Sequence, residues 1–165
     1  MIRPARPDDM GAVADVWHRA WHVAHPGNVP EGLTAARTLD AFHARTPARV
    51  ADTTVAEVDG EVVGFTMVHG DEVEQVFVDP RRHGSGIAAP LLAAAEQQVA
   101  AAGHDVAWLA VVAGNARARS FYEKHGWHDE GDLPYEVVAD GATYISPCRR
   151  YEKAVSTGGT TATGR

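Results

Sequence analysis

The N-terminal part of the chain carries its hydrophobic side chains at helical spacing. A short strand is predicted over Ile2–Ala5, followed by a helix over about Asp9–Ala24 that an aspartate of "PDD" caps. The apolar positions of this helix are Met10, Val13, Val16, Trp17, Ala20, Trp21 and Ala24. The segment "HPGNVPEG" then interrupts the pattern with prolines and glycines. A second helix is predicted over Leu33–Ala44, ending near Thr46-Pro47.

From Thr53 onward the hydrophobic period changes to two, which indicates strands. The run "TTVAEVDGEVVGFTMV" predicts a hairpin that turns at Asp59-Gly60. The run "GDEVEQVFVDP" predicts a third antiparallel strand, which Pro80 stops. The chain therefore changes from a helical opening to an antiparallel sheet.

The second half of the chain alternates helices with strands. A helix is predicted over Ile87–Ala102, a buried strand over "DVAWLAVV", and another helix over Ala116–His125 with Asn115 as its N-cap. The segment "WHDEGDLPYEVVADGATYISPCRRYEK" predicts two or three closing strands, the last pair turning at Asp140-Gly141. The final "STGGTTATGR" has nothing apolar to bury, so we expect one domain over residues 1–153 and a disordered tail over residues 154–165.

Composition and charge narrow the classes of function. The 165 residues are 45% hydrophobic and 22% charged, which is typical of a single globular domain. The net charge of −7 argues against nucleic-acid binding and suits a cationic partner. Cys148 is the only cysteine, which excludes a disulfide framework and a multi-thiolate zinc site within one chain. No membrane span or secretory signal is recognisable, so we expect a cytoplasmic protein without membrane partners.

A glycine turn between the third strand and the next helix has the features of an anion site. In "VDPRRHGSGIAAPLL", Gly84 and Gly86 precede a helix N-terminus, where unpaired backbone amides and the helix dipole favour a phosphate. Arg81 and Arg82 add positive charge. A P-loop is excluded because the lysine and the magnesium-binding hydroxyl are missing. The stretch "GSGIAA" formally fits a dinucleotide fingerprint, but no acid ends the next strand; a tight turn without a ligand is the simplest alternative.

Two motifs in the right order resemble the signature pair of the GNAT superfamily of N-acetyltransferases. The first is "VDPRRHGSGIA", similar to the R/Q-x-x-G-x-G/A pyrophosphate loop, and the second is "NARARSFYEKHGW". The resemblance covers most of the chain, including "RRYEK" as a last strand. Ala88 departs from the glycine common at its position, and alanine suits a helix. The resemblance implies an α+β, three-layer GNAT fold, with a mixed, mostly antiparallel sheet of six to seven strands and helices on both faces.

The resemblance also implies which residues bind acetyl-CoA. A bulged strand would hold the pantetheine arm through Phe77 and Val78, and Asn115 would contact it from the next helix. The glycine turn would hold the pyrophosphate through Arg81, Arg82, His83, Gly84, Ser85, Gly86, Ile87 and Ala88. Tyr122 occupies the position of a family tyrosine that lies near the coenzyme sulfur and serves as general acid. Without the motif, we would interpret Tyr122 as a core aromatic residue.

Acyl transfer also requires a group that removes a proton from the amine. Glu72 and Glu74 alternate along a strand, so their side chains share one face, and we expect Glu74 to act as the base directly or through water. A solvated pair of acids is the alternative interpretation, and His69, His25 or a water chain are other candidates for the base. Both glutamates are predicted to line the site of the acceptor amine.

The segment "WHVAHPGNVP" resembles the W-x-x-A-Y-x-G-x-x-P stretch of one GNAT branch, in which this loop walls the acceptor site. The resemblance implies that Trp21 and His25 contact the substrate, although the spacing of Trp21 also fits a core position. His25 replaces the tyrosine and is expected to titrate near neutrality. His18, His22 and His25 form a helical stripe, but no nearby carboxylate completes a ligand set, so we expect no metal.

These observations predict an acetyl-CoA-dependent N-acetyltransferase that acts on a primary amine of a small molecule, by direct transfer in a ternary complex. The alternatives are a catalytically silent acyl-CoA-binding or regulatory module on the same fold, and an oxidoreductase that uses a nucleotide cofactor. Family members often dimerise, so a homodimer is compatible with the resemblance. The acceptor's identity does not follow from the fold.

Overall fold

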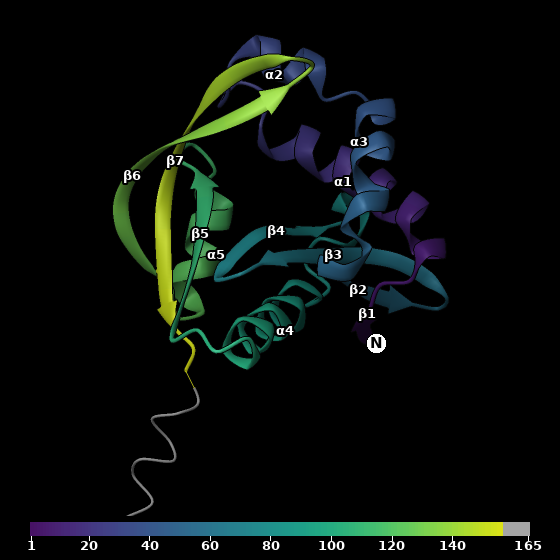
Figure 1. Ribbon diagram of the computed structural model, residues 1–165, viewed down its shortest axis with the longest axis vertical. Helices are drawn as coiled ribbons and strands as arrows, with labels where there is room; N and C mark the ends of the chain where they lie inside the picture. Colours follow the sequence, from purple (N-terminus) through teal and green to yellow (C-terminus); the bar gives the residue numbers. More distant parts are fainter. Residues whose placement is uncertain (157–165) are drawn as a thin grey trace, which may run out of the picture.

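A single sheet of seven strands, in the order β1-β2-β3-β4-β5-β7-β6, runs through the computed structural model, which describes residues 1–156 (Figure 1). The strands are β1 (Ile2–Pro4), β2 (Thr53–Val58), β3 (Glu61–His69), β4 (Glu72–Val78), β5 (Val106–Val112), β6 (His128–Ala139) and β7 (Ala142–Ala154). Neighbouring strands are antiparallel except β4 and β5, which are parallel. The predicted mixed, mostly antiparallel sheet is confirmed.

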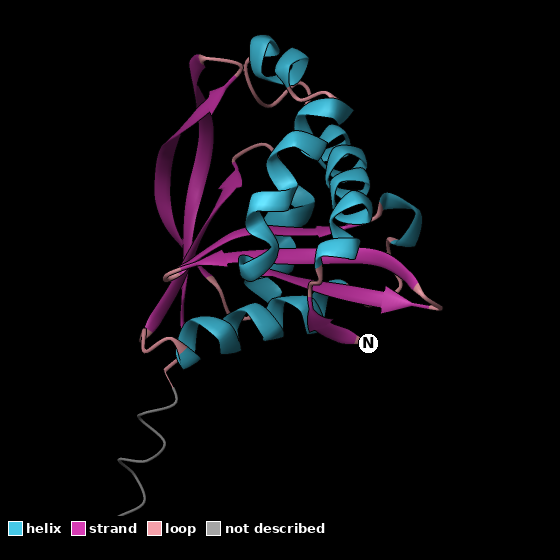
Figure 2. Ribbon diagram, turned by 45° about the vertical axis from the view of Figure 1, so that its right-hand side comes forward, coloured by secondary structure: helices cyan, strands magenta, loops and turns pink. Residues whose placement is uncertain are grey.

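Helices cover both faces of this sheet (Figure 2). They are α1 (Met10–Ala24), α2 (Glu31–Ala36), α3 (Leu39–Arg45), α4 (Ala88–Ala101) and α5 (Ala116–Lys124), with short 3₁₀ turns η1 (Pro7–Asp9), η2 (Thr46–Asp52) and η3 (Pro80–Arg82). On one face α1 and α3 bury Trp17 and Phe42 against Phe65 of β3. On the other face α4 and α5 pack with Trp127 and Tyr151 in a second core. The three-layer arrangement follows from these two cores.

Two local predictions for the helical opening are wrong. The predicted helix Leu33–Ala44 is two helices, because the Thr38 hydroxyl oxygen accepts a hydrogen bond from the Ala41 amide at 3.1 Å and begins α3 afresh. The aspartate of "PDD" does not cap α1: the carboxylate of Asp9 accepts from the Arg6 amide at 2.7 Å and from the Arg3 guanidinium. Both aspartate contacts stabilise η1, one turn earlier.

The parallel pair β4 and β5 is paired at only one position, Glu72 with Trp108. Beyond it the two strands diverge widely (Figure 1), so the edge of β4 that faces β5 has no strand partner there. A bulge also interrupts β4, because Met67 pairs with Gln75 while Val68 pairs with Val73, which leaves Glu74 as the extra residue. The sheet therefore opens where β4 carries its acidic residues.

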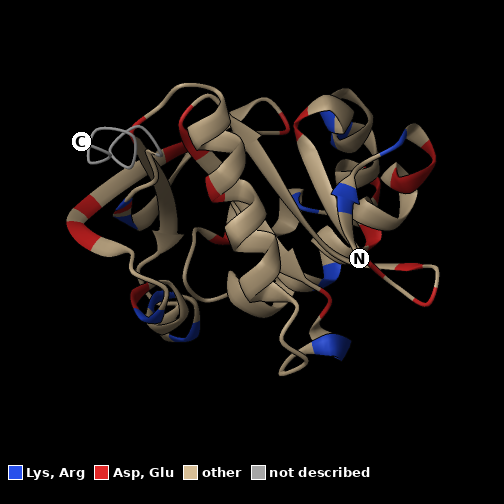
Figure 3. Ribbon diagram, turned by 90° about the horizontal axis from the view of Figure 1, so that it is seen from below, with Lys and Arg blue, Asp and Glu red and all other residues tan. Residues whose placement is uncertain are grey.

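The closing hairpin of β6 and β7 turns at Asp140 and Gly141, as predicted, and both residues have positive φ angles of 51° and 75°. Ala154 is the last residue of β7, and residues 157–165 of the predicted tail lie outside the described residues. In Figure 3, α4 shows almost no charge, since Glu96 is the only charged residue between Ala88 and Ala101. Among residues 1–156, every helix is too short or too polar to traverse a lipid bilayer.

Candidate active site

The glycine turn leaves several backbone amides without protein partners. Gly84 and Gly86 have φ angles of 82° and 80°, a conformation that favours glycine. Within residues 1–156, the amides of Gly84, Gly86, Ile87 and Ala88 donate no hydrogen bond. These N–H groups lie at the start of α4, where the helix dipole adds positive potential. Backbone amides in this arrangement can bind an anion.

A buried carboxylate fixes the start of this turn. The side chain of Asp79 is fully buried and accepts from the Arg81 amide at 3.0 Å, and from the Arg81 and Arg19 guanidinium groups at 2.7 Å. Burial would raise the pKa of Asp79, but these hydrogen bonds hold it far below its usual range. Arg81 therefore reaches back to Asp79 and does not line the neighbouring cavity, where the resemblance implied a coenzyme contact.

A cavity of about 740 Å³, here called the donor cavity, extends from the glycine turn to α5. Most of the predicted coenzyme contacts line it: Phe77, Val78, Arg82, His83, Gly84, Gly86, Ile87, Ala88, Asn115 and Tyr122. Arg81 and Ser85 do not, and the Ser85 hydroxyl bonds the Arg82 carbonyl instead. Sequence reasoning missed Arg117, which lines the cavity and donates to His83 Nδ1 at 2.7 Å. The basic residues of "NARARS" were the available signal.

The helix α5 brings Asn115 and Tyr122 to the same wall. The Asn115 side chain accepts from the Ala118 amide at 3.2 Å, which confirms it as the N-cap of α5. Tyr122 is buried, and burial raises the pKa of its phenol, so the hydroxyl is protonated at neutral pH. Both residues line the donor cavity and also a second cavity on the sheet opening.

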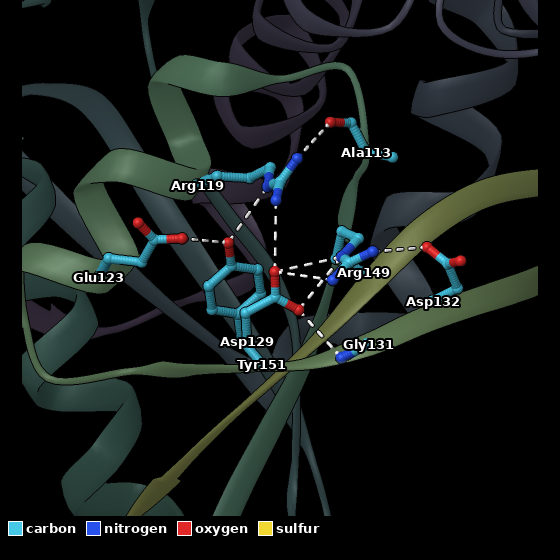
Figure 4. A network of polar contacts seen from close by, with 8 residues as sticks. All are labelled: Ala113, Arg119, Glu123, Asp129, Gly131, Asp132, Arg149 and Tyr151. Atoms are coloured by element: carbon cyan, nitrogen blue, oxygen red, sulfur yellow. Dashed lines mark hydrogen bonds and ion pairs between the residues drawn. The ribbon is translucent and has the colours of Figure 1, made fainter.

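A polar network holds α5 in place (Figure 4). The Arg119 guanidinium donates to the Ala113 carbonyl at 3.0 Å, to the Tyr151 hydroxyl at 3.2 Å and to Asp129 at 3.2 Å. The Tyr151 hydroxyl donates in turn to Glu123 of α5 at 2.6 Å. Since these bonds connect α5 with β6 and β7, they fix the orientation of the helix that carries Tyr122.

The second cavity, here called the acceptor cavity, has a volume of about 330 Å³ and lies where β4 and β5 diverge. Glu72 and Glu74 both line it. The bulge at Glu74 interrupts the simple alternation from which a shared face was predicted. Glu74 forms an ion pair of 2.9 Å with Arg49, while Glu72 accepts from the Tyr135 hydroxyl at 2.7 Å. Burial raises the pKa of Glu72 and the bond from Tyr135 opposes that shift. His69 ends β3, exposed and outside both cavities.

Trp21 and His25 form another wall of the acceptor cavity. Their rings stack at 4.5 Å between centroids, and His25 Nδ1 lies 3.1 Å from the Trp21 carbonyl oxygen, to which it donates. Burial lowers the pKa of His25 to about 4. The expectation that His25 titrates near neutrality is therefore wrong. Its neighbour His22 donates from Nε2 to the Arg37 carbonyl oxygen, 2.6 Å away, so both rings are engaged by the backbone.

Two arginines that sequence reasoning missed also line the acceptor cavity. Arg37 directly follows α2 as its C-cap and Arg45 is the last residue of α3, and both residues line the cavity. The Arg45 guanidinium lies 4.6 Å from the centre of the Trp17 ring. No sequence motif marks either residue, because their position depends on how α2 and α3 fold against α1.

Comparison with known protein families identifies the family of the chain that carries these two cavities. The family described as "Acetyltransferase (GNAT) family" matches residues 14–127. This chain belongs to the GNAT family. It is therefore an N-acetyltransferase, as its motif pair predicted. An uncharacterized N-acetyltransferase of Mycobacterium tuberculosis is 30% identical over 142 residues, which cover 80% of this chain and 89% of that protein.

Solved structures share the GNAT fold. PaiA N-acetyltransferase from Thermoplasma acidophilum, in complex with coenzyme A, has a TM-score of 0.71 and 20% identity, covering 93% of this chain and 98% of that one. YncA from Salmonella typhimurium, solved with its cofactor acetyl-CoA, has a TM-score of 0.70 and 21% identity, covering 94% of each chain. Both comparisons confirm the predicted GNAT architecture.

Proposed function

We propose that this enzyme transfers the acetyl group of acetyl-CoA directly to a primary amine of a small molecule, with both substrates bound at once. One observation carries the proposal: Tyr122 and Asn115 line both the donor cavity and the acceptor cavity. A group placed at their junction can meet a thioester from one side and an amine from the other. A covalent enzyme intermediate is unnecessary in such an arrangement.

The donor cavity supplies the groups that coenzyme A requires. Acetyl-CoA is the acetyl donor, and when bound it presents the acetyl group as a thioester. The free amides of the glycine turn suit the pyrophosphate, and Arg82 and Arg117 add positive charge at the same cavity. The open edge of β4 at Phe77 and Val78 offers backbone hydrogen bonds to an extended chain. Structures of PaiA with coenzyme A and of YncA with acetyl-CoA support this assignment.

Direct transfer forms a bond between the amine nitrogen and the acetyl carbonyl carbon and breaks the carbon–sulfur bond. The nitrogen loses a proton and the departing sulfur gains one. We assign the second task to Tyr122, because its phenol stays protonated at neutral pH and it lies at the junction. Backbone amides of β4 near Phe77 are suited to stabilise the negative charge that develops on the carbonyl oxygen.

Glu74 is our candidate for the base. It is the bulge residue of β4 and lines the acceptor cavity, so its carboxylate lies on the side from which the amine approaches. Its ion pair with Arg49 fixes the position of the carboxylate, which can take the proton directly or through water. Glu72, bonded to Tyr135, is the alternative on the same strand.

The test is turnover of acetyl-CoA with a panel of primary amines, followed as free thiol. We expect Tyr122→Phe to lower kcat by about 10- to 100-fold with little change in the KM of acetyl-CoA, since a thiolate needs only modest help from an acid. Tyr144 lies outside both cavities, so Tyr144→Phe serves as the control and should match the wild type.

Equal kcat values for Tyr122→Phe and wild type would remove Tyr122 from the chemistry. Tight coenzyme A binding without thiol release on any amine would identify a silent binding module instead.

A further inference from the structure

We infer that the acceptor carries a carboxylate as well as an amine, and that Arg37 binds this carboxylate. The substrate class is thus a small amino acid rather than a simple cationic amine. This inference rests on the proposed function, because it specifies the molecule that occupies the acceptor cavity. It reverses the expectation, drawn from the net charge of −7, that the partner is simply cationic.

Arg37 is buried without a partner for its charge. Only 6% of the residue is exposed, and its Nε atom has no hydrogen-bond partner. Within residues 1–156 no carboxylate pairs with the guanidinium, and Arg37 is one of the residues that line the acceptor cavity. Burying an unpaired charge is costly, so a guanidinium kept in this state indicates an anionic ligand.

Hydrogen bonds hold the backbone of Arg37 at the end of α2. Its amide donates to the Leu33 carbonyl at 3.1 Å and to the Thr34 carbonyl at 3.3 Å, and its own carbonyl accepts from His22. These bonds fix the end of α2 relative to α1. The buried side chain that extends from this fixed backbone ends in a planar guanidinium, which can bind a carboxylate in bidentate geometry.

Arg45 adds a second unpaired positive charge to the same wall. Its guanidinium lies over the Trp17 ring, and within residues 1–156 it forms no ion pair with a carboxylate. Burial, together with the charges of Arg37 and Arg49, lowers the pKa of Arg45 to about 10. A bound anion would relieve this repulsion between like charges.

The two walls of the acceptor cavity therefore carry opposite charge. The helical wall presents Arg37 and Arg45, and the wall formed by β4 presents Glu72 and Glu74. An amino acid fits this polarity, with its carboxylate toward the arginines and its amine toward the glutamates and Tyr122. The volume of about 330 Å³ lies at the small end of ligand sites, which suits a molecule of this size.

The experiment compares three acceptors that share one side chain: an L-amino acid, its carboxamide and the amine without the carboxyl group. L-Methionine and L-phenylalanine with their two derivatives provide two such sets. The ammonium group of the amide is more acidic than that of the amino acid, and that of the plain amine is less acidic. A preference for the amino acid over both derivatives would therefore show that the enzyme recognises the carboxylate, because the basicity of the nitrogen cannot explain it.

We expect a higher kcat/KM for at least one amino acid than for both derivatives, and Arg37→Gln should lower it by about 10- to 100-fold, mainly through KM. The same variant should change turnover of the amide less than about threefold. Arg37→Lys keeps the charge but not the bidentate geometry, so its loss should be smaller. The comparison among wild-type substrates needs no variant and remains decisive even where Arg37→Gln does not fold.

Binding of N-acetyl-L-methionine and its carboxamide to the protein with coenzyme A, measured by calorimetry, isolates the carboxylate from the amine chemistry. Tighter binding of the acid, lost in Arg37→Gln, supports the inference even without turnover. Equal kcat/KM values for the amino acids and their amides, together with equal affinities for the acetylated acid and its carboxamide, would overturn the inference about Arg37. The acetyltransferase proposal would remain intact. Absence of thiol release on every amine instead contradicts the proposed function.

Discussion

His25 is a half-buried residue whose ring is neutral at the acceptor cavity. Its Nδ1 hydrogen is donated to the Trp21 carbonyl, so the tautomer leaves Nε2 without a hydrogen and able to accept. The ring stacks on Trp21 at the acceptor cavity. A neutral ring suits a wall beside Arg37, because an imidazolium would add a further positive charge there.

The burial of His25 predicts a pH dependence of stability. Its pKa in the folded protein is about 4, below the usual value of 6.5, so protonation favours the unfolded chain. The contribution of neutral His25 is complete above pH 6.5 and is lost as the pH falls toward 4. Between pH 7 and pH 4.5, we expect the unfolding free energy of the wild type to fall by about 2 kcal/mol more than that of His25→Gln.

Urea unfolding at both pH values measures this difference, with the exposed His128→Gln as control. If His25→Gln and the wild type lose equal stability over this interval, the ring is not held neutral by burial.

At the scale of elements, the proposed coenzyme contact depends most on the glycine turn and the start of α4. A Cβ atom on Gly86 meets nothing within 4 Å, so a substitution there acts through the φ angle of 80° and not through a clash. Gly103, after α4, has a φ angle of 95° and is equally open, but it lies outside both cavities. Substitutions at Gly86 and Gly103 therefore distinguish the loss of stability caused by backbone strain from the loss of a coenzyme contact.

We expect Gly86→Ala and Gly103→Ala each to lower the unfolding free energy by about 1–2 kcal/mol, because both force an alanine into the left-handed region. Only Gly86→Ala should raise the KM of acetyl-CoA, by about tenfold, since relaxation of its φ angle moves the free amides. Thermal unfolding and initial rates provide the two measurements. An equal rise of KM in both variants would show that the turn holds no part of the coenzyme.

At this scale the sequence predicted what depends on local rules and missed what depends on packing. Residue type and spacing predicted the N-cap at Asn115, the glycine turn at Gly84 and Gly86, and the hairpin turn at Asp140-Gly141. The structure places all three as expected. The break between α2 and α3 was not predicted, because the apolar spacing continues through Arg37 and Thr38. Arg37 was not predicted either, because only the tertiary structure places it at the cavity.

On the scale of the whole molecule, one sheet consists of two halves that meet at one pair of residues. Strands β1 to β4 and strands β5 to β7 are joined through Glu72 and Trp108, supported by the Trp108 amide bond to the Asp71 carbonyl at 3.1 Å. The donor cavity spans this junction, because its walls come from β4 and α4 on one side and from α5 on the other. Coenzyme A would therefore connect the two halves.

This geometry predicts how coenzyme A changes stability and hydrogen exchange. At a concentration 100 times its Kd, a ligand specific for the folded state adds about 2.7 kcal/mol, or a Tm increase of about 5–10 °C for a chain of this size. Exchange should slow in both halves: at the amides of Gly84 and Gly86, which are free without ligand, and at the start of α5 near Asn115.

The turn of the β6–β7 hairpin at Asp140 lies outside the donor cavity and provides the internal control. Protection confined to the glycine turn, with α5 unchanged, would mean that the coenzyme does not reach Tyr122. In that case the two halves of the sheet would bind their ligands independently, and direct transfer at their junction would have no structural basis.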